Sequence, residues 1–349
     1  MDMKRDYYED VRLFTSGTVV FWFVAMLCCL AAFPLLAPNY YIYMANFMAI
    51  NVIVAIGLNL LVGYTGQISM GHSGFFAIGA YGTIMLMKAA GFPFLLALPT
   101  AALIAAIFGF LIGFPALRLE GPYLAIATLG FGLTITMVFG KIEFFGGRQG
   151  LHVPALTIGP WHINTDKDFY FLLIPITILL ALFARNLVRT KVGRAFIAIR
   201  DDDVAAETMG VNLAFYKTLS FAVSAFYAGI GGGLYAYVLR FIEPEMFNLV
   251  LSIFFLAFIV VGGLGSIMGA IAGACLISWL DLTLRHILEV PVLGTWLETL
   301  SESYFSITGV SNIQFIVLGL IMIVVMVFEP LGIYGIWLRT KKFWMTWPF

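Results

Sequence analysis

Apolar residues run along this chain in long blocks separated by short polar stretches. Several blocks exceed the roughly eighteen apolar residues that a membrane-spanning helix needs. The third segment, 74–88, is short, and the eighth and ninth, 249–265 and 267–288, are almost continuous. Half-helices or a re-entrant element therefore fit at these segments. The pattern predicts an all-α, polytopic membrane protein with about 8–10 transmembrane helices. The ten segments are 18–36, 41–62, 74–88, 93–117, 123–140, 170–188, 219–239, 249–265, 267–288 and 312–334.

The composition agrees with this pattern and excludes several classes of protein. The chain is 62% hydrophobic and 11% charged, with zero formal net charge, and its mean hydropathy is +0.99. A soluble domain is therefore excluded, and nucleic acid is not expected as a partner because there is no basic tract. The three cysteines lie in apolar segments, which favours neither a disulfide framework nor a metal site. We expect a single transmembrane domain over residues 1–349.

The distribution of basic residues predicts the orientation of the chain. Lys and Arg gather in the N-terminal tail, in the region 185–217 and in the C-terminal tail, and such residues concentrate on the cytoplasmic side. The loop 189–218 and both termini should therefore be cytoplasmic, and the connection 141–169 extracytoplasmic. The residues concerned are Lys4, Arg5, Arg12, Arg185, Arg189, Lys191, Arg194, Arg200, Lys217, Arg339, Lys341 and Lys342.

The stretch 192–220 is a charged island between the sixth and seventh apolar segments. The aspartates at 201–203 suit the first turn of a helix, where their charge complements the helix dipole. Gly210 is placed to end that helix, and Asn212 can cap the next one. Ala205 and Ala206 would give the helix a smooth surface that a partner can approach closely. A short, bounded helix on the cytoplasmic face is predicted, either as a docking site or as an ordinary interfacial helix.

A second unusual stretch, 62–82, is interrupted by six glycines. Glycine permits close helix packing and also unwound backbone, which at membrane depth must be enclosed by protein or line a water-filled cavity. Two interpretations remain open here, a tight cytoplasmic turn and an unwound lining of the translocation path. The candidate lining residues are Gly63, Thr65, Gly66, Gln67, Ser69 and His72, with Ser73 beside them.

Few ionisable side chains lie inside the apolar segments. Asp281 and Arg285 are spaced i, i+4, so a structural ion pair on one helix face is favoured over a proton relay. A Gly-His-Ser-Gly sequence at 71–74 contains Ser73, and His286 could act as its base,. An intramembrane serine protease is therefore a remote alternative, although it leaves the charged island unexplained.

The charged island also carries a resemblance to known proteins. Importers of the ATP-binding-cassette (ABC) type have a cytoplasmic Glu-Ala-Ala-x-x-x-Gly loop whose helix docks into the ATPase subunit. This chain has Val204-Ala205-Ala206-x-x-x-Gly210, with valine in place of the glutamate. The chain resembles the LivM-type permeases of branched-chain amino-acid ABC importers over nearly its whole length, excluding the N-terminal tail and 289–311. The similar stretches are VGRAFIAIRDDDVAAETMGVN (192–212), GLNLLVGYTGQISMGHSGFFAIGAY (57–81), GPYLAIATLGFG (121–132), FIVVGGLGSIMGAIAGA (258–274) and VFEPLGIYG (327–335).

This resemblance implies a transporter subunit rather than an enzyme. It would move leucine, isoleucine, valine or a related small solute across the inner (plasma) membrane by ATP-driven alternating access, with urea or short amides as the alternative cargo. The implied partners are a LivH-like second permease, two cytoplasmic ABC ATPase subunits and a periplasmic solute-binding protein, with membrane lipid around the spans of the permease. No cofactor is expected on this chain, because the ATPase subunits would use ATP and Mg. The implied coupling surface is Arg200, Asp201, Asp203, Ala205, Ala206, Glu207 and Gly210.

Overall fold

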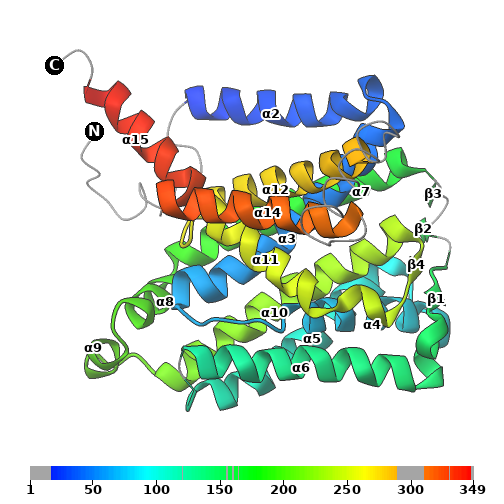
Figure 1. Ribbon diagram of the computed structural model, residues 1–349, viewed down its shortest axis with the longest axis horizontal. Coiled ribbons are helices and arrows are strands. Elements are labelled where there is room, and N and C mark those ends of the chain that lie inside the picture. The colour runs from blue at the N-terminus through cyan, green and yellow to red at the C-terminus, as the bar shows by residue number, and fades with distance from the viewer. Residues whose placement is uncertain are drawn as a thin grey trace, which may run out of the picture.

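The computed structural model is a bundle of long helices that lie roughly along one axis (Figure 1). It describes residues 17–119, 121–154, 156–158, 161–163, 165–288, 310–329 and 331–346. Within these ranges the helices are α2 (Gly17–Leu36), α3 (Asn39–Thr65), α4 (His72–Ala90), α5 (Phe94–Ala116), α6 (Pro122–Lys141), α7 (Asp166–Arg189), α8 (Lys191–Asp201), α9 (Asp203–Thr208), α10 (Leu213–Leu239), α11 (Leu249–Gly262), α12 (Ile267–Leu288), α14 (Val310–Phe328) and α15 (Gly332–Thr346).

Among the described residues, seven helical stretches are long and apolar enough to cross a membrane. Two further helices, Val20–Leu36 and Leu249–Gly262, are apolar but shorter. The prediction of an all-α membrane protein is confirmed. The segment expected at 312–334 instead contains nearly all of α14 and the start of α15, and Arg339, Lys341 and Lys342 belong to α15.

The centre of the bundle is formed by α3 and α10, which are both 27 residues long. They run in opposite directions (Figure 1). The ring of Phe47 near the start of α3 lies 5.9 Å from that of Tyr235 near the end of α10. At the other end, Gln67 just beyond α3 reaches Ser220 in the first turns of α10. Most of the side chains of both helices are buried, so the core of the molecule surrounds this antiparallel pair.

Each central helix is followed by a segment without α-helix that turns back into the bundle. Residues 66–71 connect α3 to α4 and run inward from the end at which α8 lies (Figure 1). Residues 240–248 connect α10 to α11 from the opposite end and contain a short 3-10 helix, η3 (Pro244–Phe247). We call these two stretches the inserted segments. Each of them follows one helix of the antiparallel central pair, and they enter the bundle from opposite ends.

The two ends of the bundle differ in structure. Helices α8, α9 and α15 lie at one end, and four short strands lie at the other (Figure 1). Strand β1 (Leu151–His152) pairs with β4 (Phe241–Ile242), and β2 (Leu156–Ile158) pairs with β3 (Trp161–Ile163), both antiparallel. The strand end also holds the 3-10 helices η1 (Glu143–Phe145) and η2 (Gly147–Gln149). The connection 141–169 and the loop 189–218 are thus on opposite ends, as the basic-residue distribution predicted.

Candidate functional site

The charged island folds into two short helices, α8 and α9, that meet at Asp202. The Asp202 carboxylate accepts a hydrogen bond of 2.9 Å from the backbone N–H of Ala205 and so caps α9,. Gly210 follows α9 with a φ of 85°, in the left-handed region that favours glycine,. The Asn212 side chain then accepts from the N–H of Phe215 at 3.0 Å and caps α10. The predicted bounded helix, with its caps, is confirmed.

The sequence suggested that the aspartates 201–203 all lie in the first turn of one helix. In the structure they lie in different places. Asp201 is the last residue of α8, and its carboxylate accepts from the Arg200 guanidinium at 3.1 and 3.2 Å. Asp202 is the cap. Asp203 lies in the first turn of α9 and forms an ion pair with Lys217 on α10. The helix boundary falls between them because the chain is extended at Asp202.

The outer surface of α9 carries two large apolar side chains, although the surrounding sequence is rich in charge. Val204 is 72% exposed and Met209 is 84% exposed, while Ala205, Glu207 and Gly210 are also exposed. Ala206 is only 4% exposed because it faces the interior of the protein. The expectation that both alanines form the approach surface is therefore wrong for Ala206. It shapes the helix, and Val204 and Met209 are surface residues that sequence reasoning did not select.

Helix α8 was not expected, and it holds α9 in place. Its buried side chains lie on one face and pack between α3 and α7. The sequence signal for α8 is the amphipathic spacing of its buried residues, which is hard to recognise among so many charged residues. The buried residues of this face are Gly193, Ala195, Phe196 and Ile199.

Two polar contacts connect α8 and α9 to the central helices. Lys217 on α10 is only 8% exposed, and its ammonium group is neutralised by Asp203. From the end of α8, Arg200 donates to the carbonyl oxygen of Gly63 in the last turn of α3, at 3.0 Å. Displacement of α9 would therefore act on the last turn of α3 and the first turns of α10. The structure brings together Arg200 of the predicted coupling surface and Gly63 of the predicted lining.

The first inserted segment is unwound and enclosed by neighbouring helices. It begins at Gly66, whose φ is 73°, and Gln67, Ser69 and Gly71 are buried. The backbone N–H of Met70 donates to the Thr128 hydroxyl at 3.0 Å, part-way along α6. This position fits unwound backbone covered by protein better than a turn at the surface.

Helices α4 and α11, which follow the two inserted segments, contact each other in their first turns. The Ser252 hydroxyl of α11 accepts from the backbone N–H of Ser73 at 3.0 Å and donates to its hydroxyl at 2.9 Å. Next to this contact, His72 Nε2 lies 3.1 Å from the hydroxyl of Ser224 on α10. Four buried polar side chains therefore join α4, α10 and α11 deep in the bundle.

Several buried polar atoms in this stretch have no hydrogen-bond partner among the described residues. They are the side-chain oxygens of Gln67 and Ser69 and the Nδ1 atom of His72. Buried polar groups are costly to leave unpaired, so such atoms are suited to contact water or a polar solute. Gln67 and Thr65 also line a cavity that reaches Arg200 and Lys217 at the α8 end.

Two further candidates from the sequence are the Asp281–Arg285 pair and the serine-protease residues Ser73 and His286. Asp281 and Arg285 form the predicted i, i+4 ion pair, with 3.3 Å between Asp281 Oδ2 and Arg285 Nη2. Ser73 is fully buried and is hydrogen-bonded to Ser252, and the side chain of His286 lies outside the described residues. No described contact supplies Ser73 with a histidine base, so nothing in this arrangement supports the protease alternative.

Comparison with known proteins identifies the family. Residues 40–326 match the family model described as branched-chain amino acid transport system / permease component. Over 281 residues the chain is 36% identical to the high-affinity branched-chain amino acid transport system permease protein LivM of Escherichia coli, which covers 73% of this chain and 66% of that protein. The LivM protein of Salmonella typhimurium is 35% identical over 279 residues, with the same coverage.

A second set of relatives is more distant. The LivH permease protein of Escherichia coli is 27% identical over 308 residues, covering 81% of this chain and 90% of that protein. No solved structure matches the chain. The aligned part spans just under two thirds of the LivM relatives' own length. The family model nevertheless covers most of the chain, which therefore belongs to the family of permease components of branched-chain amino acid transport systems.

Proposed function

We propose that this chain is a permease subunit of an ABC importer for leucine, isoleucine and valine, and that α9 receives the force from the ATPase. The observation that carries the proposal is how α9 is attached. It is an exposed, capped helix joined to α10 by the Asp203–Lys217 ion pair and, through Arg200 of α8, to the end of α3. The family relationship supports the cargo.

Motion of α9 would reach the first inserted segment by a short route. Arg200 contacts Gly63 directly, and its aliphatic part packs against Gly66, where the segment begins. On the other side, Lys217 precedes Ser220 by one helical turn, and Ser220 lies 3.5 Å from the Gln67 amide. The candidate path residues Gly63, Thr65, Gly66, Gln67, Ser69 and His72 follow in order from that point.

The proposed assembly supplies what this chain's fold does not. Its partners are a LivH-like second permease, two cytoplasmic ATPase subunits that bind ATP and Mg, and a periplasmic solute-binding protein. The chain would cross the inner membrane several times, with α8, α9 and both termini in the cytoplasm. The strand end would then face the binding protein.

The coupling role can be tested by placing a charge on the exposed surface of α9. Met209→Glu should abolish uptake of labelled leucine in cells that express the chain together with its partner subunits, while insertion and amount of the chain stay normal. The reason is that an acidic side chain on an apolar contact surface must be desolvated without a partner. Gly210→Pro should act in the same way by altering the end of α9.

A matched control uses another exposed apolar residue at the same end of the bundle. Leu264 is 52% exposed in the turn between α11 and α12, and Leu264→Glu should leave uptake largely intact. Normal ATP-driven uptake in Met209→Glu and Gly210→Pro would refute the assignment of α9. Uptake of urea or acetamide in place of leucine by the wild-type complex would refute the cargo but not the coupling role.

A further inference from the structure

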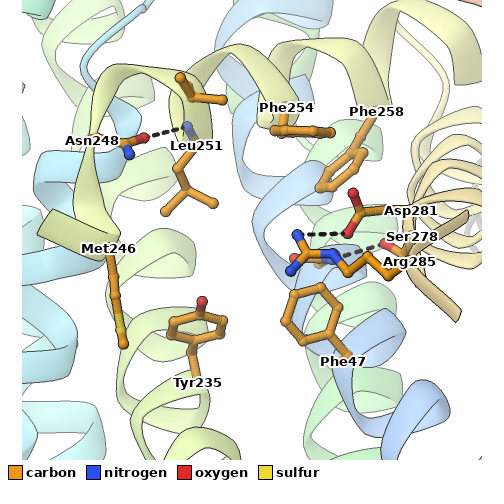
Figure 2. A pocket seen from close by; sticks show the side chains of 12 residues that line it. Phe47, Tyr235, Met246, Asn248, Leu251, Phe254, Phe258, Ser278, Asp281 and Arg285 are labelled. Atoms are coloured by element: carbon orange, nitrogen blue, oxygen red, sulfur yellow. Dashed lines mark hydrogen bonds and ion pairs between the residues drawn. The ribbon is translucent and has the colours of Figure 1, made fainter. Parts of the chain in front are cut away.

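A cavity of about 180 Å³ lies between α3, α10, α11 and α12 (Figure 2). Its polar residues on α12 lie in the C-terminal half of that helix, at the end remote from α8 and α9. The cavity is smaller than the roughly 300–1,000 Å³ that is usual for drug-sized ligands, so it suits a small solute. On the proposed orientation it lies in the outer half of the membrane.

One wall of the cavity carries a cation and an anion side by side. Asp281 and Arg285 are 3.3 Å apart, and the side chain of Arg285 is 57% exposed while that of Asp281 is 9% exposed. Figure 2 shows the guanidinium group directed toward the middle of the cavity. Nearby, Asn51 of α3 donates to the Ser278 hydroxyl of α12 at 2.8 Å, which fixes the two helices at this level.

The rest of the lining is mainly apolar, with Tyr235 and Asn248 as polar residues across from the ion pair. Phe254 and Phe258 of α11 lie on one side of the ion pair and Phe47 of α3 on the other (Figure 2). Leu251 closes the side toward α10. A charged pair beside aromatic and aliphatic side chains is complementary to a molecule that has both charges at one end and a hydrocarbon group at the other.

We propose that this cavity is a binding subsite for an apolar α-amino acid. Arg285 would bind the α-carboxylate, Asp281 the α-ammonium group, and the side chain of the ligand would contact Phe47, Phe254 and Phe258. The inference deepens the proposed function and rests on it, because it takes amino acids as the cargo. It assigns to this permease a direct part in recognising them.

Charge balance supports this ligand over others of similar size. The Asp281–Arg285 pair is neutral as a whole, and so is an amino-acid zwitterion. Binding exchanges one ion pair for two and leaves no net charge in a region where uncompensated charge is costly. A carboxylic acid or an amine alone would leave one protein charge without a partner, and urea would use neither charge.

A purely structural ion pair would not require these surroundings. An i, i+4 pair on a helix surface contributes only a few tenths of a kcal/mol. Here the pair lies beside a cavity that residues of four helices and η3 line, and an aromatic ring is present on each side. The two roles can be separated because they predict different outcomes when both charges are removed together.

The test measures binding of labelled leucine to the full chain purified in lipid nanodiscs. Two competitors each lack one charge: leucinamide has no carboxylate, and 4-methylpentanoate has no ammonium group. The wild-type chain should bind leucine saturably at up to millimolar concentration and prefer it over both competitors by about tenfold or more, as expected for charged hydrogen bonds. Arg285→Gln should weaken leucine binding and abolish the preference over leucinamide. Asp281→Asn should do the same for 4-methylpentanoate.

Two control proteins distinguish recognition from folding. The double variant Asp281→Asn/Arg285→Gln leaves no unpaired charge, so it should unfold thermally like the wild type and still fail to bind leucine. Arg339→Gln breaks another ion pair, the 2.9 Å contact with Glu329, and should bind leucine normally.

Unchanged leucine affinity in folded Asp281→Asn and Arg285→Gln, or no saturable binding by the wild type, would overturn the subsite. If the wild-type complex still imports leucine in cells, that result leaves the proposed function standing. Failure of the wild-type complex to import leucine would instead overturn the proposed function.

Discussion

At the scale of single residues, glycine contacts hold the first inserted segment against its neighbours. A Cβ atom at Gly71 would overlap the carbonyl group of Thr128 on α6, and one at Gly74 would lie 3.0 Å from the Cα of Gly132. These contacts need backbone without side chains on at least one partner. Packing, rather than turn geometry, accounts for glycine here, because neither Gly71 nor Gly74 has a positive φ.

This contact predicts different effects for two glycine-to-alanine changes. Gly71→Ala should lower the free energy of unfolding by about 1–3 kcal/mol, the usual cost of overpacking, because α6 must move away. Gly130→Ala is the matched control on α6, since a Cβ there meets nothing within 4 Å. It should be neutral or stabilise the helix by about 0.5–1 kcal/mol. Denaturant unfolding of the two purified variants checks the difference, and equal stability would contradict the packing argument.

At the scale of elements, the sequence predicted α9 well and missed the parts set by tertiary contacts. Caps are local, so Gly210 and Asn212 marked their helix ends without knowledge of the fold. The burial of Ala206 and the second inserted segment, 240–248, depend on helices distant in the sequence. Neither has a local signature. The hydrogen bond between Ser73 and Ser252 could not be predicted from the sequence for the same reason, since 179 residues separate them.

The attachment of α9 to α10 predicts an asymmetry between two charge removals. Asp203→Asn leaves the buried Lys217 ammonium group without its counterion, and breaking such a pair costs up to about 3–5 kcal/mol where both groups are buried. Asp203 is 33% exposed, so a smaller loss is expected. Lys217→Met keeps the aliphatic stem and leaves only the accessible carboxylate unpaired, so it should destabilise less.

The comparison is made by thermal unfolding of both variants in the same detergent, with Asp201→Asn as the control. The Asp201 carboxylate is 64% exposed and its partner Arg200 keeps the contact with Gly63. A larger loss of stability in Lys217→Met than in Asp203→Asn would contradict the assignment of Lys217 as the buried charge.

At the scale of the whole molecule, the arrangement of ends predicts which residues each side of the membrane can reach. With Cys28, Cys29 and Cys275 replaced by serine, Glu207→Cys on α9 should react with a membrane-impermeant thiol reagent only in inside-out vesicles. Gln149→Cys in η2, at the strand end, should react only in intact spheroplasts. Reaction of both positions from the same side would contradict the placement of the two loops at opposite ends of the bundle.

The matching lengths of α3 and α10, and the inserted segment that follows each, have a consequence for energetics. If one half of the chain adopts the conformation of the other, and the reverse, a second state results whose free energy is close to that of the first. About 2.7 kcal/mol of differential binding is enough to move such a balanced equilibrium to 99:1 in either direction. The direction of transport would then be set by the proteins bound on either side, and the membrane-spanning part itself would work equally well in reverse.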